Sequence, residues 1–288
     1  MPQWNCACRN CEAARAGRIR PRTQSCIAIS DGSGRWFLVN ASPDLRAQLE
    51  TYPDLRPAPS SLRNSPISGV LLTNADLDHV LGLFLLREGG PVEIHATAAV
   101  RSILENSLGL SNILDAMCGT VWHEPPARQF RPLGSGVSGK NLSYRAIELP
   151  GRPPRFAGKG SSTGVHAVAY EFRNEQTGGR MVIAPDVPAV NDALRKALVE
   201  ADAVLFDGTF WSSNELSTVK RDAPEAKEMG HLTIKDSSLA LLAELKARQK
   251  IYVHINNTNP ILALGSPERG KVEAAGVVVA YDGLEFEL

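Results

Sequence analysis

The pattern of apolar and polar positions changes along the chain. Up to residue 184, short alternating or apolar runs predict strands at 24–30, 35–40, 67–72, 92–96, 141–149, 165–172 and 180–184. Helices are expected at 42–50, 80–86 and 97–107. Beyond residue 190, helices at 190–201, 236–247 and 268–275 alternate with strands at 203–206, 251–255 and 277–281. Two such half-patterns predict an α/β (α+β) fold, a four-layer αβ/βα sandwich.

The segments between these elements have the composition of turns and loops. Residues 31–34 read Asp-Gly-Ser-Gly and connect two predicted strands, so we expect a hairpin there. Residues 121–139 are rich in proline and glycine and are expected to be mostly loop, and 134–139 and 157–164 are expected to be surface loops.

Polar side chains lie between an apolar strand and an apolar helix in residues 71–83. Asn74, Asp76, Asp78 and His79 all follow the strand. Ligands in layered α/β proteins bind beyond the carboxyl ends of strands. Asp78 and His79 are oxygen and imidazole donors that suit iron, manganese or zinc. An acidic helix start with an N-capping residue explains the same window, and the window alone leaves both interpretations open.

Three further polar residues follow apolar, strand-like runs: Asp186, Asp207 and His254. Several such runs that bring acids and imidazoles to one edge of a sheet are what a metal site requires. Each residue alone has an ordinary explanation, since Asp186 lies in a turn-forming Pro-Asp-Val-Pro sequence and Asp207 precedes Gly208. Asp207 is also suited to orient a ligand histidine through a hydrogen bond.

The other histidines and amides carry weaker signals. His95, His123 and His166 have no convergent partners in the sequence, and we assign them no function. The run at 256–260 is too polar for a simple strand exit, so the amides of Asn256 and Asn259 are expected to contact a polar substrate or zinc.

Three of the five cysteines lie within six residues, at Cys6, Cys8 and Cys11. Thiolates this close together select zinc or iron–sulfur centres. They favour metal or redox chemistry in a reducing compartment over disulfides. We expect a loop that binds structural Zn²⁺ in preference to a redox dithiol or plain thiols, although no fourth ligand lies nearby in the sequence.

Length and composition agree with a globular protein of the cytoplasm. The 288 residues are 43% hydrophobic and show no strong internal boundary. A single domain over 1–288, with the cysteine segment 1–25 inside it, is therefore expected. The formal net charge of zero gives no electrostatic footprint for nucleic acid. No apolar run approaches the ~20 residues that a membrane span needs, and no apolar core follows the N-terminal arginines as in a secretory signal.

The loop at 73–79 resembles a motif of metallo-β-lactamase-fold proteins. Its Thr73-x-x-x-x-Asp78-His79 matches their Thr-His-x-His-x-Asp-His, with Asn74 and Asp76 in place of the two upstream histidines. Two-metal hydrolases of this fold use those histidines to hold the first metal. The first pocket is therefore expected to be weak or empty, which favours a mononuclear site of two histidines and a carboxylate, open to O2.

Two other segments extend the resemblance to nearly the whole chain. Residues 2–11, Pro-Gln-Trp-Asn-Cys-Ala-Cys-Arg-Asn-Cys, and residues 254–260, His-Ile-Asn-Asn-Thr-Asn-Pro, are similar to the B proteins of pyrroloquinoline quinone (PQQ) biosynthesis. Members of that family usually begin with an apolar strand before the first of these segments. The present sequence starts at Met1, so we expect the first strand of the sheet to be missing.

The resemblance implies roles for individual residues. It implies that the active-site ion is bound by Asp78, His79, Asp186 and His254. It further implies catalytic roles for His231, Asp76 and Asp207 and substrate contacts for Asn74, Asn256 and Asn259. Asn257 takes the position of a histidine that completes a comparable cysteine cluster in related phosphodiesterases, so it is the implied fourth zinc ligand.

The activity that the resemblance implies is an iron-dependent hydroxylation in PQQ biosynthesis. The substrate would be the tyrosine ring of a cross-linked Glu–Tyr precursor, with O2 as co-substrate, Fe²⁺ at the active site and structural Zn²⁺ at the cysteines. A carrier that delivers PQQ or its precursor toward the periplasm and a zinc-dependent hydrolase are the two alternatives. The expected partners are the small-molecule precursor and, if the chain self-associates, a second copy in a homodimer.

Overall fold

The structure is a computed structural model that describes residues 1–60, 62–134, 141–158 and 163–288. The predicted surface loops at 134–139 and 157–164 lie mostly outside the described residues. The chain forms two compact units, residues 1–23 with 179–288 and residues 24–178, and each is described by itself. In the described part of the chain, no helix has the length and apolar character that crossing a membrane requires.

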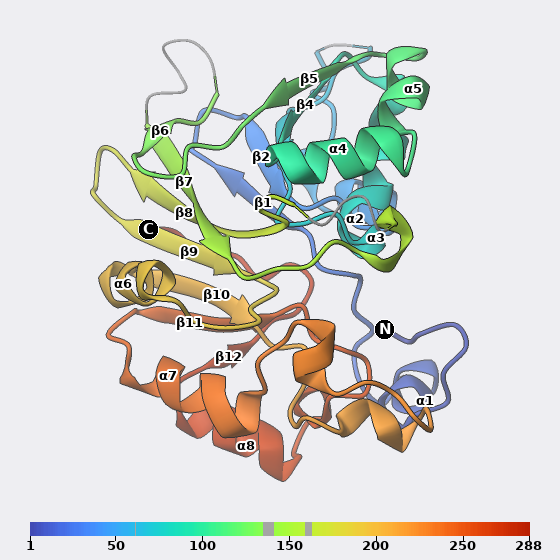
Figure 1. Ribbon diagram of the computed structural model, residues 1–288, viewed down its shortest axis with the longest axis vertical. Coiled ribbons are helices and arrows are strands. Elements are labelled where there is room, and N and C mark those ends of the chain that lie inside the picture. Colours follow the sequence, from blue (N-terminus) through green and yellow to red (C-terminus); the bar gives the residue numbers. More distant parts are fainter. Residues whose placement is uncertain (61, 135–140, 159–162) are drawn as a thin grey trace. The chain divides into compact units, whose positions relative to one another are not determined.

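The unit of residues 24–178 contains a five-stranded sheet in the order β1-β2-β3-β4-β5 (Figure 1). Its strands are β1 (Ile27–Ser30), β2 (Trp36–Val39), β3 (Ile67–Leu71), β4 (Val92–His95) and β5 (Thr120–His123). The predicted hairpin is confirmed, since β1 and β2 pair antiparallel with Ile27 opposite Val39. Strands β2 to β5 are parallel, so their carboxyl ends lie at one edge of the sheet.

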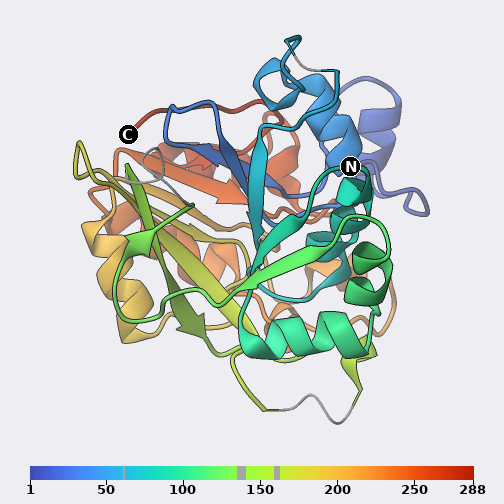
Figure 2. The same cartoon turned by 90° about the horizontal axis from the view of Figure 1, so that it is seen from above.

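Helices cover one face of this sheet. They are α2 (Leu45–Thr51), η1 (Pro53–Leu55), α3 (Leu77–Val80), η2 (Leu81–Glu88), α4 (Ala98–Asn106), α5 (Leu110–Asp115) and η4 (Arg155–Ala157). Figure 2 shows α4 and α5 beside β4 and β5 in a second view. Thr97 caps α4, because its side chain accepts a hydrogen bond from the Val100 backbone N–H.

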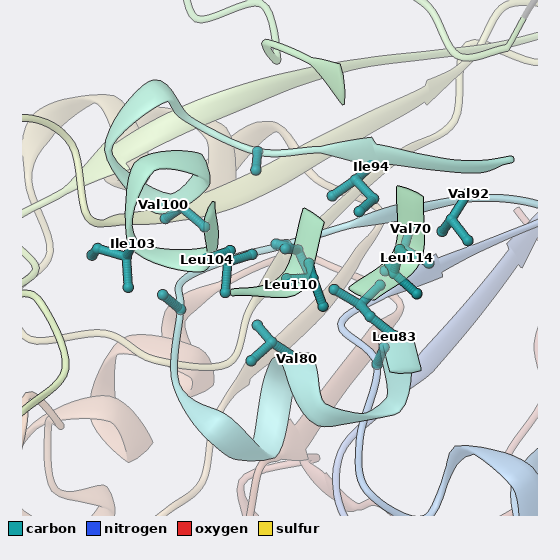
Figure 3. Packing of buried hydrophobic residues seen from close by; sticks show 14 of the residues in the cluster. Val70, Val80, Leu83, Val92, Ile94, Val100, Ile103, Leu104, Leu110 and Leu114 are labelled. Atoms are coloured by element: carbon teal, nitrogen blue, oxygen red, sulfur yellow. The ribbon is translucent and has the colours of Figure 1, made fainter. Parts of the chain in front are cut away.

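The core of the unit lies between these helices and the sheet (Figure 3). Val70 and Ile94 of the strands and Val100 and Leu104 of α4 all belong to this core, and all four are fully buried. Burying each such side chain contributes about 1.5–3 kcal/mol. The alternation in β4 therefore sends Val92 and Ile94 into this core and its other side chains to the opposite face.

The opposite face packs against an antiparallel sheet of β6 (Arg131–Pro132), β7 (Leu142–Leu149) and β8 (Ala167–Asn174). The Tyr170 hydroxyl donates to the backbone oxygen of Leu72 at 3.0 Å, directly after β3. The Tyr144 ring lies edge-on against His95, with ring centroids 5.4 Å apart. Aromatic side chains of the second sheet therefore contact the carboxyl ends of β3 and β4.

The unit of residues 1–23 and 179–288 contains four parallel strands in the order β12-β11-β10-β9. The strands are β9 (Arg180–Ala184), β10 (Ala203–Asp207), β11 (Gln249–Val253) and β12 (Val278–Val279). The connecting helices are α6 (Asp192–Glu200), η6 (Glu215–Thr218), η7 (Ala226–Met229), the π-helical η8 (Ile234–Ser238), α7 (Leu239–Glu244), η9 (Pro260–Leu262) and α8 (Pro267–Ala274). This alternation of strand and helix confirms the prediction for the C-terminal third of the chain.

Two predicted segments differ in detail from the structure. Residues 81–88 form the 3₁₀ helix η2 and not an α-helix. The Gly82 N–H donates to the backbone oxygen of Ala41 at 2.9 Å, so it makes no helical bond. The cysteine cluster does not lie wholly in a loop, because helix α1 (Arg9–Arg15) begins after Cys8 and contains Cys11. The alanines after Cys11 favour this helix.

Most described residues of the segment 121–139 lie in loops, as expected, but the segment also contains parts of two short strands. Residues 120–123 form the edge strand β5, and residues 131–132 form the short β6. The Thr-Val-Trp-His sequence of β5 is rich in β-branched and aromatic residues, but the two prolines that follow it concealed this signal. Helix α5 was also not predicted.

Candidate metal centre

In the unit of residues 1–23 and 179–288, three predicted site residues follow three adjacent parallel strands. Asp186 lies just after β9, Asp207 ends β10, and His254 follows β11. His254 has a φ of 54°, which is an unusual conformation for a non-glycine residue. Backbone strain of this kind costs free energy and is concentrated at functional sites. The parallel register thus brings these side chains to one edge of the sheet, as the sequence predicted.

Asp186, His231 and His254 form a cluster whose ligand atoms lie within 4.8 Å of one another. Asp186 Oδ1 is 3.6 Å from His254 Nδ1 and 4.0 Å from His231 Nε2. The two imidazole rings are stacked with centroids 5.6 Å apart. All three side chains are largely buried, at 12–14% exposure. A carboxylate and two imidazoles in this arrangement are a donor set for a divalent transition metal.

Asp207 contacts His231 directly and His254 through the Thr209 hydroxyl. Its Oδ2 lies 2.8 Å from His231 Nδ1, and its Oδ1 accepts a hydrogen bond from the Thr209 hydroxyl at 2.7 Å. Thr209 Oγ1 in turn lies 2.9 Å from His254 Nδ1. When the Thr209 hydroxyl donates to Asp207 or to the His254 backbone oxygen, the His254 ring donates to Thr209 from Nδ1. This leaves the lone pair on Nε2 of His254 for a metal.

Burial and the neighbouring carboxylates act in opposite directions on the pKa of His231. Burial lowers it, but the negative charge and hydrogen bond of Asp207, with a further contribution from Asp186, outweigh burial and raise the pKa of His231 above its ordinary value. Burial would raise the pKa of Asp207, yet the charge of His231 and the hydrogen bonds to that carboxylate keep the pKa below its usual range. The raised pKa favours the protonated form of His231, so this member of the cluster is suited either to bind a metal once deprotonated or to donate a proton.

In the unit of residues 24–178, the side chain of His79 is fully buried and that of Asp78 is half-exposed. His79 Nε2 lies 3.7 Å from Asp78 Oδ2. Thr73 Oγ1 lies 3.2 Å from His79 Nδ1, and Asn40 fixes Thr73 by accepting from its backbone N–H and donating to its hydroxyl, both at 2.9 Å. No sequence signal singled out Asn40, which has a φ of 64° and joins the end of β2 to the residues after β3.

The two substituted positions of the loop have backbone roles. Asn74 is buried, and its Oδ1 accepts a hydrogen bond from the Asp76 N–H at 2.9 Å. The Asp76 backbone oxygen accepts from the His79 N–H at 2.9 Å, so Asp76 starts helix α3. Asn74 therefore shapes the turn that presents His79, and its predicted contact with substrate stays a prediction, as does the catalytic role of Asp76.

His166 is a candidate that the sequence analysis passed over. It is 4% exposed, and neither ring nitrogen has a hydrogen-bond partner in the described residues. The Val168 N–H donates to the Thr73 backbone oxygen at 2.8 Å, so the start of β8 lies beside the loop that carries Asn74. In the sequence, His166 lies only near the start of a predicted strand. The folded structure shows that this start lies at the carboxyl ends of the parallel strands.

The three predicted zinc cysteines come together in the unit of residues 1–23 and 179–288, with sulfur atoms within 4.8 Å of one another. The Asn257 side-chain nitrogen lies 3.3–3.5 Å from all three sulfurs, so the predicted fourth residue is at the cluster. Rotation of the amide by 180° would present its oxygen as a ligand. Asn10 anchors this loop by donating to the backbone oxygens of Asn257 and Asn259 at 2.9 and 2.8 Å.

The remaining amides of the 256–260 segment are engaged in the loop itself. Asn259 is fully buried and donates to the backbone oxygens of Gly208 and Thr209, while its Oδ1 accepts from the Ile261 N–H. Asn256 donates to the Thr258 hydroxyl. These bonds give both side chains a structural role, and substrate contact by either remains a prediction.

Comparisons with known proteins agree with this architecture. A family model described as "Beta-lactamase superfamily domain" matches residues 35–255. The chain is 39% identical over 293 residues to "Coenzyme PQQ synthesis protein B" of Stutzerimonas stutzeri and 40% identical over 302 residues to that of Methylobacterium radiotolerans. In each case the match covers 100% of this chain and 96% of the relative.

Solved structures give the same result. The crystal structure of Zn²⁺-bound PqqB from Methylobacterium extorquens aligns with a TM-score of 0.88 and 35% identity, over 100% of this chain and 95% of that chain. A diphosphatase from the PhnP family aligns with a TM-score of 0.66 at 18% identity, over 100% of this chain and 92% of that chain, which supports the fold alone. The chain therefore has the metallo-β-lactamase fold and belongs to the coenzyme PQQ synthesis protein B family.

Proposed function

We propose that this chain acts in PQQ biosynthesis as an iron-dependent hydroxylase of the tyrosine ring in the cross-linked Glu–Tyr precursor. Full-length similarity to coenzyme PQQ synthesis proteins B supports the biosynthetic role. The cluster of Asp186, His231 and His254 beyond parallel strand ends supports a metal-dependent enzyme. The cytoplasmic location, the homodimer and the single domain remain predictions.

The observation that carries a one-ion site is the loop at 73–79. It keeps Asp78 and His79 but has Asn74 and Asp76 at the positions of two imidazole ligands, and the Asn74 oxygen is already engaged by the Asp76 N–H. The ligand set that the family resemblance implies for this ion is Asp78, His79, Asp186 and His254, and we adopt it for the proposal. Two imidazoles and carboxylates fit Fe²⁺ with open positions, and the bound iron would supply the activation of O2.

The surrounding residues would orient the substrate and hold protons. Asp207 raises the pKa of His231 and so favours its protonated form, whose Nε2–H would donate to the developing phenolate oxygen of the tyrosine ring. Thr209 and Thr73 would keep the two ligand histidines in the tautomer that leaves Nε2 available.

The experiment loads the full chain with Fe²⁺ without oxygen, adds the cross-linked precursor and a two-electron reductant such as ascorbate, and then admits isotopically labelled O2; one oxygen atom enters the ring and the reductant converts the other to water. A product that carries labelled oxygen is expected from the wild type and not from His254→Ala. An unlabelled precursor after complete iron loading contradicts the proposal. If the chain is a carrier, His79→Ala should bind PQQ or its precursor as well as the wild type, whereas the hydroxylase requires His79 for product formation.

A zinc-dependent hydrolase is the second candidate, and His166 favours it. This buried imidazole beside the 73–79 loop adds a donor to the pocket that lacks two histidines, and a homologous structure was solved with Zn²⁺ bound. A two-ion site requires His166, so His166→Ala should lose one metal equivalent per chain. If the site holds one ion, His166→Ala should keep the metal content of the wild type and lose less activity than His254→Ala.

A further inference from the structure

A second group of metal-type donors lies in the five-stranded sheet, outside the site described above. Strands β4 and β5 lie side by side (Figure 1), their register pairs His95 with His123, and Glu93 lies two residues before His95. Because side chains alternate along a strand, these three share the face opposite to Val92 and Ile94. The sequence expectation that His95 and His123 have no convergent partners was wrong, because only strand pairing brings them together.

The donor atoms of Glu93, His95 and His123 lie within 4.8 Å of one another. His123 Nε2 is 3.4 Å from Glu93 Oε2. Ligand atoms bound to one tetrahedral zinc at 2.0–2.1 Å are roughly 3.4 Å apart, so this pair already has the spacing of two zinc ligands. Small rotations of the half-exposed Glu93 and His123 side chains would bring both to His95.

His95 is the fixed member of the group. It is 5% exposed, its Nδ1 lies 2.8 Å from the Tyr144 hydroxyl, and its Nε2 has no hydrogen-bond partner in the described residues. When Nδ1–H donates to Tyr144, the lone pair on Nε2 is available to a metal. A ligand histidine is commonly held in this way by its other nitrogen.

An orphaned nitrogen in such a buried ring is costly unless it binds something. Burial, reinforced by the nearby His123, lowers the pKa of His95 to about 3. The imidazole is therefore neutral at physiological pH, which is the form that binds metals. A simple ion pair between Glu93 and His123 would explain those two side chains but would leave His95 Nε2 without a partner.

We propose that Glu93, His95 and His123 bind a divalent transition metal, with zinc as the probe, in a site separate from both the strand-end centre and the cysteine cluster. The ion would tie the edge strand β5 to β4 through three side chains and leave one position to water. None of the residues assigned to the proposed hydroxylase takes part. The two proposals can therefore fail independently.

Equilibrium dialysis of the full chain against micromolar free Zn²⁺ tests the site, with the bound metal counted per chain. Wild type should bind one equivalent more than His123→Ala and one more than Glu93→Gln. Glu124→Gln is the matched control, because Glu124 is exposed and directly follows β5; it should bind as the wild type does. Equal zinc content in the wild type and both site variants overturns the proposal.

Two further measurements distinguish loss of the metal site from a folding defect of the variants. Zn²⁺ should raise the melting temperature of the wild type and Glu124→Gln by more than that of His123→Ala and Glu93→Gln, because a ligand that binds only the folded state stabilises it. Zinc-edge anomalous diffraction from crystals soaked in Zn²⁺ should give a peak between the three side chains. A zinc-saturated crystal with no peak there contradicts the site.

Discussion

A threonine hydroxyl lies behind each candidate ligand histidine. Thr209 joins His254 to the buried Asp207, and Thr73 joins His79 to Asn40. The sequence identified the histidines from their positions after apolar runs, but it gave no reason to single out the threonines. Their role depends on the χ angles and backbone positions of residues far apart in the chain, and only the folded chain fixes these.

Thr209→Val tests this arrangement. Without the hydroxyl, His254 loses the partner that fixes its tautomer, so affinity of the strand-end site for Fe²⁺ or Zn²⁺ should fall by about 10–100-fold. Competition with a metal-binding dye measures the change. Thr51→Val is the control, since Thr51 is exposed on α2 and bonds only to the helix backbone. Unchanged affinity in Thr209→Val means that the hydroxyl does not orient the ligand.

The buried Glu215 predicts a pH effect on stability. Its two oxygens accept hydrogen bonds from the Thr258 hydroxyl and the Trp211 N–H, both at 2.6 Å. Burial outweighs these bonds and raises the pKa of Glu215 to about 7. The folded state therefore holds this proton more tightly than the unfolded state does. Its contribution is fully present below about pH 4.5 and is lost as pH rises to about 7.

Urea unfolding of wild type and Glu215→Gln across this range is the measurement. The free energy of unfolding of the wild type, relative to that of the variant, should fall by up to about 3 kcal/mol between pH 4.5 and 7. A difference that stays constant with pH would show that Glu215 titrates with its ordinary pKa.

At the scale of elements, the strand ends were predicted well and the connections less well. The strands before Asp186, Asp207 and His254 were expected from apolar runs, and all three form. Short runs carry this signal because a buried parallel strand is apolar on both faces. Strand β5 and helix η2 were misread, because their conformations depend on packing partners that no local pattern contains.

Close packing at Gly82 is an element-scale test. A Cβ at Gly82 would lie 2.3 Å from the Ser42 backbone oxygen and 2.8 Å from that of Ala41. Ala41, next to Ser42 in the chain, also donates a backbone N–H hydrogen bond to the His79 backbone oxygen at 2.7 Å. Gly82→Ala should therefore lower the free energy of unfolding by about 1–3 kcal/mol and reduce metal content by displacing His79.

Chemical denaturation and metal analysis measure both effects. Gly90→Ala is the matched control, because a Cβ there has no atom within 4 Å among the described residues. If Gly82→Ala is as stable as Gly90→Ala, the loop shifts easily and does not fix His79.

At the scale of the whole molecule, the cysteine cluster joins chain segments almost 250 residues apart. Cys6, Cys8 and Cys11 surround Asn257, and Asn10 holds the backbone of the same loop. The sequence predicted a zinc site from the thiol spacing. The structure adds the residue that faces the thiols, and zinc binding itself is a prediction.

Cys8→Ser tests the cluster. The variant should lose one zinc equivalent per chain, and limited proteolysis should cleave within residues 1–23 faster than in the wild type, because the bound ion ties this segment to the 254–260 loop. Cys118→Ser is the control, since Cys118 lies outside the cluster. Chelation of the wild type should reproduce the faster cleavage. Identical cleavage of both variants contradicts a zinc clasp.

The sequence by itself determined the fold class, the strand ends that carry Asp186, Asp207 and His254, and the cysteine cluster, because hydrophobic periodicity and ligand spacing are local properties. Only the tertiary structure revealed the threonine supports, the position of His166 at the strand-end edge, and the group of Glu93, His95 and His123. Each of these depends on which strands pair and in which register, and pairing is decided by burial over the whole sheet and not by the residues of one strand.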